Sequence, residues 1–155
     1  MVTVAIAVPS EYGYIIAVLV AIYLQQNLAF VLQVAQQRRL TGIKAPSFYP
    51  RDSEIKALKL NTEQVESYIY AQRVHQNNME LMSFFIPVFL IAGLYAPVNV
   101  AIAGASIVGF RFLYGFAPRK SVLRRFAALF HFSELYVLYV AGVFAISLVS
   151  NNHVA

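Results

Sequence analysis

The sequence of 155 residues contains no cysteine. A chain without cysteine forms no disulfide, holds no cysteine-ligated metal and supplies no thiolate of its own as a nucleophile. Charged residues are also scarce, at 12% of the chain, against about 25% in an average soluble domain. The first shortage excludes chemistry on a thiol of the protein, and the second is untypical of a soluble domain.

Apolar residues take the place of the missing charge. They make up 59% of the chain and give a mean hydropathy of +0.62, whereas an ordinary globular domain is about 45–50% apolar. The composition therefore predicts an integral membrane protein, and the length fits a single domain, residues 1–155.

Four apolar segments are candidate membrane spans, at residues 12–35, 71–96, 98–116 and 126–149. Each is close to the ~20 residues that a helix needs to cross ~30 Å of hydrocarbon. None shows the strict alternation of a barrel strand, so helices are favoured. We expect an all-α, four-helix membrane bundle. Asn61-Thr62-Glu63 predicts a helix start that extends the second span beyond the membrane.

The net charge of +5 is concentrated in two connections between spans. The first contains Arg38, Arg39, Lys44, Arg51, Lys56 and Lys59, and the second contains Arg119, Lys120, Arg124 and Arg125. Basic residues beside apolar spans are typical of the cytoplasmic side of a membrane protein and do not indicate a nucleic-acid partner. We expect both connections to face the cytoplasm, from the endoplasmic reticulum or another organelle membrane such as the mitochondrial one.

A polar stripe precedes the apolar run of the second span. Arg73, Asn77 and Glu80 stand at i, i+4 and i+7, at about 0°, 40° and 340° around a helix, so they share one face. Ionisable residues where a helix enters the membrane are costly unless they are used, which makes them a functional hypothesis. An internal Arg73–Glu80 ion pair is the structural alternative.

Arginines from other spans lie toward the same end of the predicted bundle. Arginine binds carboxylates through a planar fork and keeps its charge when desolvated, so a cluster of them suits a small anion with several carboxylates. Two alternatives remain open: Arg111 snorkels to the interface, and Arg38 is only a topology signal. No second histidine follows His75 at i+3 or i+4, so a metal site is not expected.

Several motifs resemble the superfamily of membrane-associated proteins in eicosanoid and glutathione metabolism (MAPEG). QRVHQNNMEL at 72–81 is similar to the second-helix signature, most closely that of the type-3 microsomal glutathione transferases. SEYGY at 10–14, LQVAQQRR at 32–39 and SIVGFRFLYGF at 106–116 match further family patterns in order and spacing. The resemblance covers nearly the whole chain.

The resemblance implies a homotrimer that binds glutathione as co-substrate at each subunit interface, near the cytoplasmic side. It assigns a glutathione carboxylate to Arg38 and the peptide to Arg73, Asn77 and Glu80, with His75 as a further polar contact. Arg111 precedes the aromatic site on the third helix, and Arg111 and Tyr114 are further candidates for binding glutathione. Arg124, or Arg125 if the alignment slips by one, would activate the thiol toward a hydrophobic electrophile or a lipid hydroperoxide.

The third helix departs from the family pattern. Phe112 and Phe116 stand where tyrosines are common, and only Tyr114 keeps a hydroxyl. Two alternatives to a transferase or peroxidase therefore remain: a non-catalytic lipid-binding protein of the same fold, and a structural subunit of a larger membrane complex.

Overall fold

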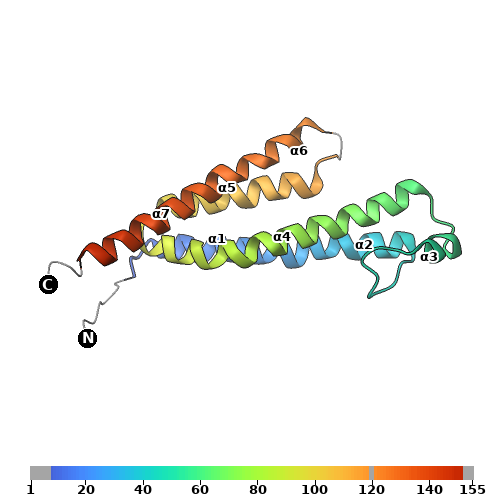
Figure 1. The fold of residues 1–155 in the computed structure, drawn as a ribbon, viewed down its shortest axis with the longest axis horizontal. Helices are drawn as coiled ribbons and strands as arrows, with labels where there is room; N and C mark the ends of the chain where they lie inside the picture. Colours follow the sequence, from blue (N-terminus) through green and yellow to red (C-terminus); the bar gives the residue numbers. More distant parts are fainter. Residues whose placement is uncertain (1–7, 119–120, 152–155) are drawn as a thin grey trace. The chain divides into compact units, whose positions relative to one another are not determined.

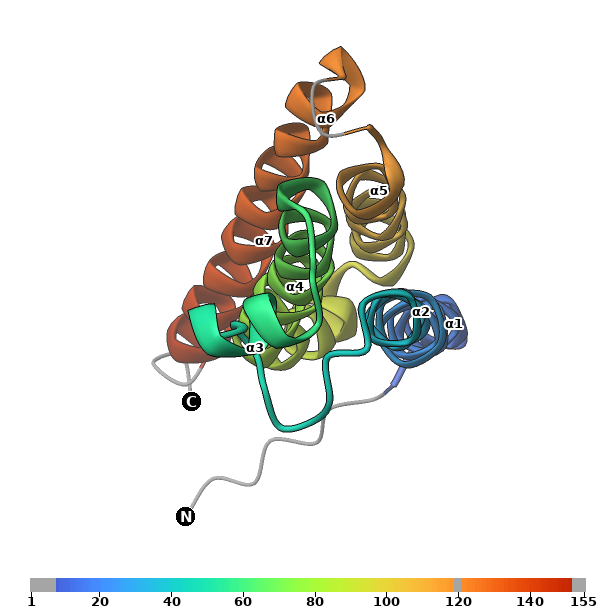
Figure 2. The same cartoon turned by 90° about the vertical axis from the view of Figure 1, so that its right-hand side faces the viewer.

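The computed structural model describes residues 8–118 and 121–151, and within these ranges all regular structure is helical, as the length and pattern of the apolar segments predicted. Figures 1 and 2 show the elements from two directions. In chain order they are α1 (Tyr12–Leu24), the π-helical turn η1 (Gln25–Phe30), α2 (Val31–Thr41), α3 (Asp52–Ala57), α4 (Thr62–Tyr95), α5 (Pro97–Phe116), α6 (Val122–Phe126), the 3-10 turn η2 (Ala127–Leu129) and α7 (Phe130–Asn151). Arg119 and Lys120, expected in the second basic connection, lie outside the described residues.

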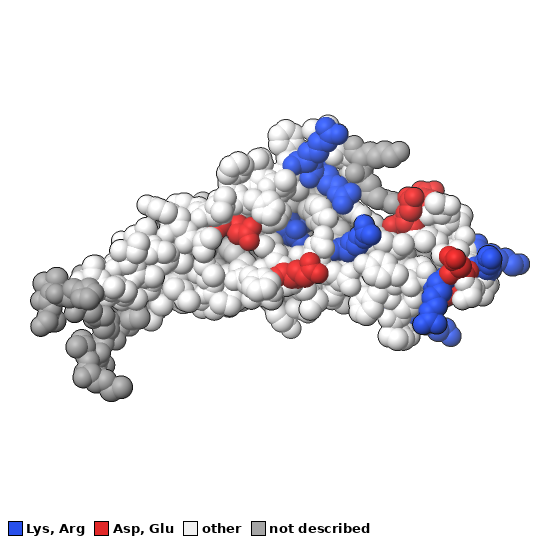
Figure 3. Space-filling view, viewed as in Figure 1, with Lys and Arg blue, Asp and Glu red and all other residues white. Residues whose placement is uncertain are grey.

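Four continuous helical runs are long and apolar enough to cross a membrane. They are Tyr12–Thr41, Thr62–Tyr95, Pro97–Phe116 and Val122–Ser150. The predicted spans fall inside these runs except for Ala96, which lies in the bend between α4 and α5. No Lys, Arg, Asp or Glu occurs at residues 12–37, 81–110 or 135–155, and the face drawn in Figure 3 accordingly has a broad region without charge.

The start of α4 confirms the predicted extension of the second span. Asn61 Oδ1 accepts a hydrogen bond from the backbone N–H of Gln64 at 2.9 Å, and Gln64 Oε1 accepts one from the backbone N–H of Asn61 at 3.0 Å. This reciprocal pair satisfies two backbone donors that a helix N-terminus otherwise leaves without partners. The helix then continues unbroken through Pro87 to Tyr95.

Contacts divide the chain into two compact units, of which the first combines the residues up to Ile22 with those from Met82 onward. In this unit α5 packs along α7. Gly104 on α5 allows a close helix approach, since a Cβ there would lie 2.5 Å from the Phe89 ring and 2.9 Å from Val18 Cγ1. Tyr12 donates from its hydroxyl to the Leu90 carbonyl at 3.1 Å.

The second unit extends from Tyr23 to Leu81 and contains the first connection. Asn78 Nδ2 on α4 donates to Gln26 Oε1 at 2.7 Å, a hydrogen bond between amides of two helices, as is common in membrane bundles. Asn27, one residue further along the chain, bonds within its own helix instead. Its exposed side chain donates back to the Tyr23 carbonyl of its own helix at 3.1 Å.

Candidate functional site

The polar stripe lies on the outward face of α4. Arg73, Asn77 and Glu80 are all exposed, whereas Tyr68, Ala71, Gln72, Val74, Asn78 and Met82 of the same helix are buried. The helical period thus divides this segment into one face that packs within the chain and one that is open to a ligand or to another molecule. His75 is half-buried between these two faces.

Arg38, expected beside the stripe, is instead engaged with the first connection. Its guanidinium donates to the carbonyl oxygen of Ser47 at 3.0 Å and to that of Ile43 at 3.5 Å. The guanidinium carbon also lies 5.5 Å from the centre of the Tyr68 ring, within the range of a cation–π interaction. Arg38 is therefore part of the packing of this unit and not merely a topology signal, while Arg39 beside it is exposed.

In the first unit two arginines gather around one phenol ring. The guanidinium carbons of Arg111 and Arg124 lie 5.1 Å and 4.9 Å from the centre of the Tyr114 ring. Arg124 Nη2 also lies 3.4 Å from the Tyr114 hydroxyl oxygen, to which it donates. The two cations are thus at most about 10 Å apart by the sum of these distances, and the carboxylate of Glu134 on α7 also interacts electrostatically with Arg111.

Arg111 is only 4% exposed and does not snorkel to the interface. Its guanidinium lies between the Tyr114 ring and the Phe130 ring, whose centre is 5.2 Å away. Arg124 is half-buried on the short helix α6. The Ser121 hydroxyl caps this helix by accepting from the Leu123 N–H at 3.1 Å. The sequence missed Phe130, since nothing in its spacing relates it to Arg111.

The two phenylalanines in the tyrosine positions form a separate apolar surface. The Phe112 and Phe116 rings stack with centres 4.6 Å apart, and the side chains are 48% and 47% exposed. They stand on the outward face of α5, whereas Val100, Gly104, Ile107, Arg111 and Gly115 form its buried face. These rings can contact an apolar substrate or lipid but cannot hydrogen-bond to a peptide.

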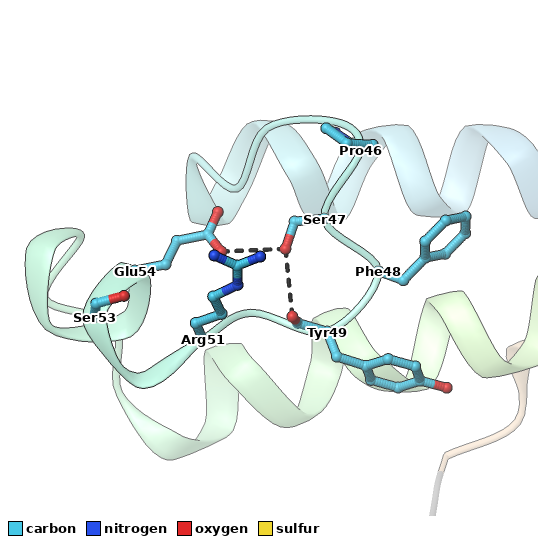
Figure 4. A pocket seen from close by; sticks show the side chains of 7 residues that line it. All are labelled: Pro46, Ser47, Phe48, Tyr49, Arg51, Ser53 and Glu54. Atoms are coloured by element: carbon cyan, nitrogen blue, oxygen red, sulfur yellow. Dashed lines mark hydrogen bonds between the residues drawn. The ribbon is translucent and has the colours of Figure 1, made fainter.

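A cavity of about 600 Å³ opens in the first connection, in the second unit. Figure 4 shows its lining: Pro46, Ser47, Phe48, Tyr49, Arg51, Ser53 and Glu54. The Ser47 hydroxyl lies 3.1 Å from Glu54 Oε2 and 3.4 Å from the Tyr49 carbonyl oxygen, so these polar groups are satisfied within the connection itself. Sequence reasoning placed no functional residue here.

The described residues form a helical protein with four helices long and apolar enough to span a membrane, which indicates an integral membrane protein, and with two sets of polar side chains, one in each unit. The family model of MAPEG matches residues 15–144, so the chain belongs to the MAPEG family. No individual curated protein and no solved structure matches it significantly. The family contains glutathione transferases, glutathione peroxidases and members with other roles.

Proposed function

We propose that this protein is a membrane-bound glutathione transferase or peroxidase, similar to the type-3 microsomal glutathione transferases. The observation that carries the proposal is the exposed stripe of Arg73, Asn77 and Glu80 on the outward face of α4. Glutathione has two carboxylates and one ammonium group. A guanidinium and a carboxylate on one face match these charges, and the amide between them suits a peptide backbone.

The stripe faces away from the packed side of its own chain, which supports a site completed by a neighbouring subunit. We propose the homotrimer that the family resemblance implies, with glutathione bound between subunits. His75 borders the stripe as a further polar contact. The family resemblance also implies glutathione-binding roles for Arg111 and Tyr114, and activation of the sulfur by Arg124.

The chemistry requires a thiolate, because a thiol is a poor nucleophile. A guanidinium beside the sulfur favours the charged form and lowers the pKa of the thiol, and we assign this role to Arg124. In a transferase reaction the thiolate attacks an electrophilic carbon and a carbon–sulfur bond forms. In a substitution the leaving group departs as an anion with the electron pair of the broken bond; in an addition to an activated double bond the π electrons move to the neighbouring atoms, which take up a proton from water. In a peroxidase reaction it attacks the peroxide, the O–O bond breaks and the alcohol leaves with a proton. A second glutathione then reduces the sulfenic acid to give the disulfide and water.

The hydrophobic substrate would reach this site from the lipid. The exposed stack of Phe112 and Phe116 offers an apolar surface on the same helix as Arg111 and Tyr114. The rings lie on the outward face of α5 and Arg111 on its buried face, so we assign to the rings only the contact with the lipophilic molecule as it arrives from the lipid.

Binding of glutathione to the purified protein tests the proposal. We expect saturable binding by titration calorimetry, and at least a tenfold loss of affinity in Arg73→Ala because a charged hydrogen bond contributes about 1.5–3 kcal/mol. Lys56→Ala removes an exposed cation of the same unit and should leave binding unchanged. Equal affinity of Arg73→Ala and Lys56→Ala would refute the assignment of the stripe.

On α5, Phe112 and Phe116 stand where tyrosines are common in the family, so two hydroxyl groups are missing. This difference favours a second candidate function, a non-catalytic lipid-binding protein or a structural subunit of a larger membrane complex. Phe112 and Phe116 are exposed and stacked, and this surface suits lipid or another protein. Stable co-purification with a larger complex, together with the absence of any thiolate signal from bound glutathione, would support this candidate over the enzyme.

A further inference from the structure

The first connection folds back along α4 instead of extending into solvent. Gly42 ends α2 with a φ of 75°, and its N–H donates to the Arg38 carbonyl at 2.9 Å. Glycine adopts this left-handed conformation without the penalty of a Cβ atom. Ile43 then buries its side chain to 1% exposure, and the Ser47 N–H donates to the Lys44 carbonyl at 3.2 Å. The chain has now reversed its direction.

Two side chains hold the reversed segment at a single carbonyl group. The Ser47 carbonyl accepts from the Arg38 guanidinium and from the Tyr68 hydroxyl. Gln72 Nε2 donates to the same Tyr68 hydroxyl at 2.9 Å. Tyr68 and Gln72 are buried on α4, at 0% and 2% exposure. Both donors to this carbonyl therefore come from helical side chains, and the Arg38 guanidinium is already occupied by groups of its own chain.

This anchor brings Tyr49 to the edge of the polar stripe. The Tyr49 hydroxyl donates to Gln76 Oε1 at 3.3 Å, and Figure 4 shows the Tyr49 side chain extending away from Arg51 and Glu54. Gln76 lies at about 300° on α4 when Arg73 is set at 0°, next to Glu80 at about 340°. The phenol is half-exposed at this position.

We propose that Arg38 is a positioning residue that fixes the first connection to α4, and that Tyr49 is a further binding residue for the glutathione peptide. The inference rests on the proposed function for its ligand. The family resemblance assigns Arg38 to a carboxylate of glutathione, whereas the structure assigns its guanidinium to the carbonyls of Ser47 and Ile43. Tyr49 supplies a phenol to a protein that has phenylalanine at positions 112 and 116.

Carboxylate esters of glutathione distinguish a positioning role of Arg38 from direct contact. Affinity is measured for glutathione and for its two monoethyl esters, each of which masks one carboxylate. We expect Arg38→Ala to weaken binding of all three ligands by the same factor, about threefold to tenfold. If Arg38 instead forms a direct ion pair with one carboxylate, the ester that masks this carboxylate has already lost the ion pair. That ester would then bind wild type and Arg38→Ala equally well, and this result would overturn the positioning role.

Tyr49→Phe removes one hydroxyl from an exposed ring and leaves the fold intact. We expect glutathione affinity to fall about threefold to tenfold, the range for loss of one hydrogen bond. Tyr23→Phe, a change of the same kind at a 65% exposed ring, should have no effect. The double variant Arg38→Ala/Tyr49→Phe should bind no more weakly than Arg38→Ala, because the loop no longer delivers the phenol. Unchanged affinity in Tyr49→Phe, or full additivity, would overturn the inference.

Amide hydrogen exchange of the ligand-free protein gives a readout that does not depend on glutathione. Amides of residues 43–50 should exchange at least tenfold faster in Arg38→Ala than in wild type, with exchange of residues 82–95 unchanged. If wild type fails to bind glutathione while this exchange effect is present, the proposed function is wrong and the anchoring role of Arg38 stands. If exchange in residues 43–50 is unaffected, the anchoring role is wrong even where binding is observed.

Discussion

Replacement of Gly104 by alanine tests the closest helix packing in the first unit. The added Cβ would lie 2.5 Å and 2.9 Å from two atoms of the Phe89 ring and 2.9 Å from Val18 Cγ1. These distances are well inside van der Waals contact, and Phe89 is fully buried and stacked on Phe85 with ring centres 5.3 Å apart. The ring therefore has no free space to move into, and the helices must separate.

The expected magnitude follows from two opposing effects. Overpacking of a tight interior costs about 1–3 kcal/mol, and the severity of the contact places this change near the upper end. Alanine is favoured over glycine within a helix by up to about 1 kcal/mol. We therefore expect Gly104→Ala to lower the free energy of unfolding by about 2 kcal/mol.

Gly109→Ala on the same helix is the matched control, because a Cβ there meets no atom of the chain within 4 Å. It should be neutral or stabilising by up to about 1 kcal/mol. The assay is dodecyl sulfate titration of the protein in mixed micelles, followed by far-ultraviolet circular dichroism. Phe89→Leu should partly restore Gly104→Ala, with a coupling energy above about 0.5 kcal/mol. Equal stability of the two glycine variants would refute the packing argument.

Two further predictions concern the candidate site and the interhelical amides. Arg124→Ala should shift the thiolate absorbance titration of bound glutathione to higher pH by about one unit, because a nearby cation lowers a thiol pKa and its removal raises it. Arg125→Ala is the control. If the titration shifts in Arg125→Ala and not in Arg124→Ala, Arg125 is the residue that activates the thiol. Asn78→Ala leaves Gln26 Oε1 without its donor and should cost about 1–3 kcal/mol in the dodecyl sulfate assay. Asn27→Ala, which changes an exposed amide, should cost much less; equal losses would contradict the interhelical bond.

Helical periodicity was sufficient to predict the face of α4. The spacing of Arg73, Asn77 and Glu80 depends only on local geometry, and all three are exposed in the structure. The start of α4 was equally readable, because Asn61 and Gln64 cap the helix within one turn. In both cases the interactions that decide the structure lie within a few residues of each other.

The partners of Arg38 and Arg111 were not predictable in the same way. Arg38 bonds to a carbonyl nine residues away and lies over a ring thirty residues away. Both contacts depend on how the connection turns after Gly42. Arg111 lies between Tyr114, one helical turn along, and Phe130 at the start of α7. Spacing places a side chain on a helix face, but the packing of connections and neighbouring helices decides what that face contacts.

The length of α4 gives the exposed stripe a physical consequence. A helix needs ~20 residues to cross the hydrocarbon, yet the charge-free run from Leu81 to the helix end at Tyr95 has only 15. Counted back from Tyr95, ~20 residues reach Gln76, which brings Glu80 and Asn77 within the hydrocarbon thickness. A carboxylate there is unfavourable against lipid, so an outward Glu80 requires cover by a polar ligand or by another protein surface. Under the proposed function, a bound glutathione and a neighbouring subunit would both remove this polar face from lipid, so ligand binding and subunit assembly should stabilise each other.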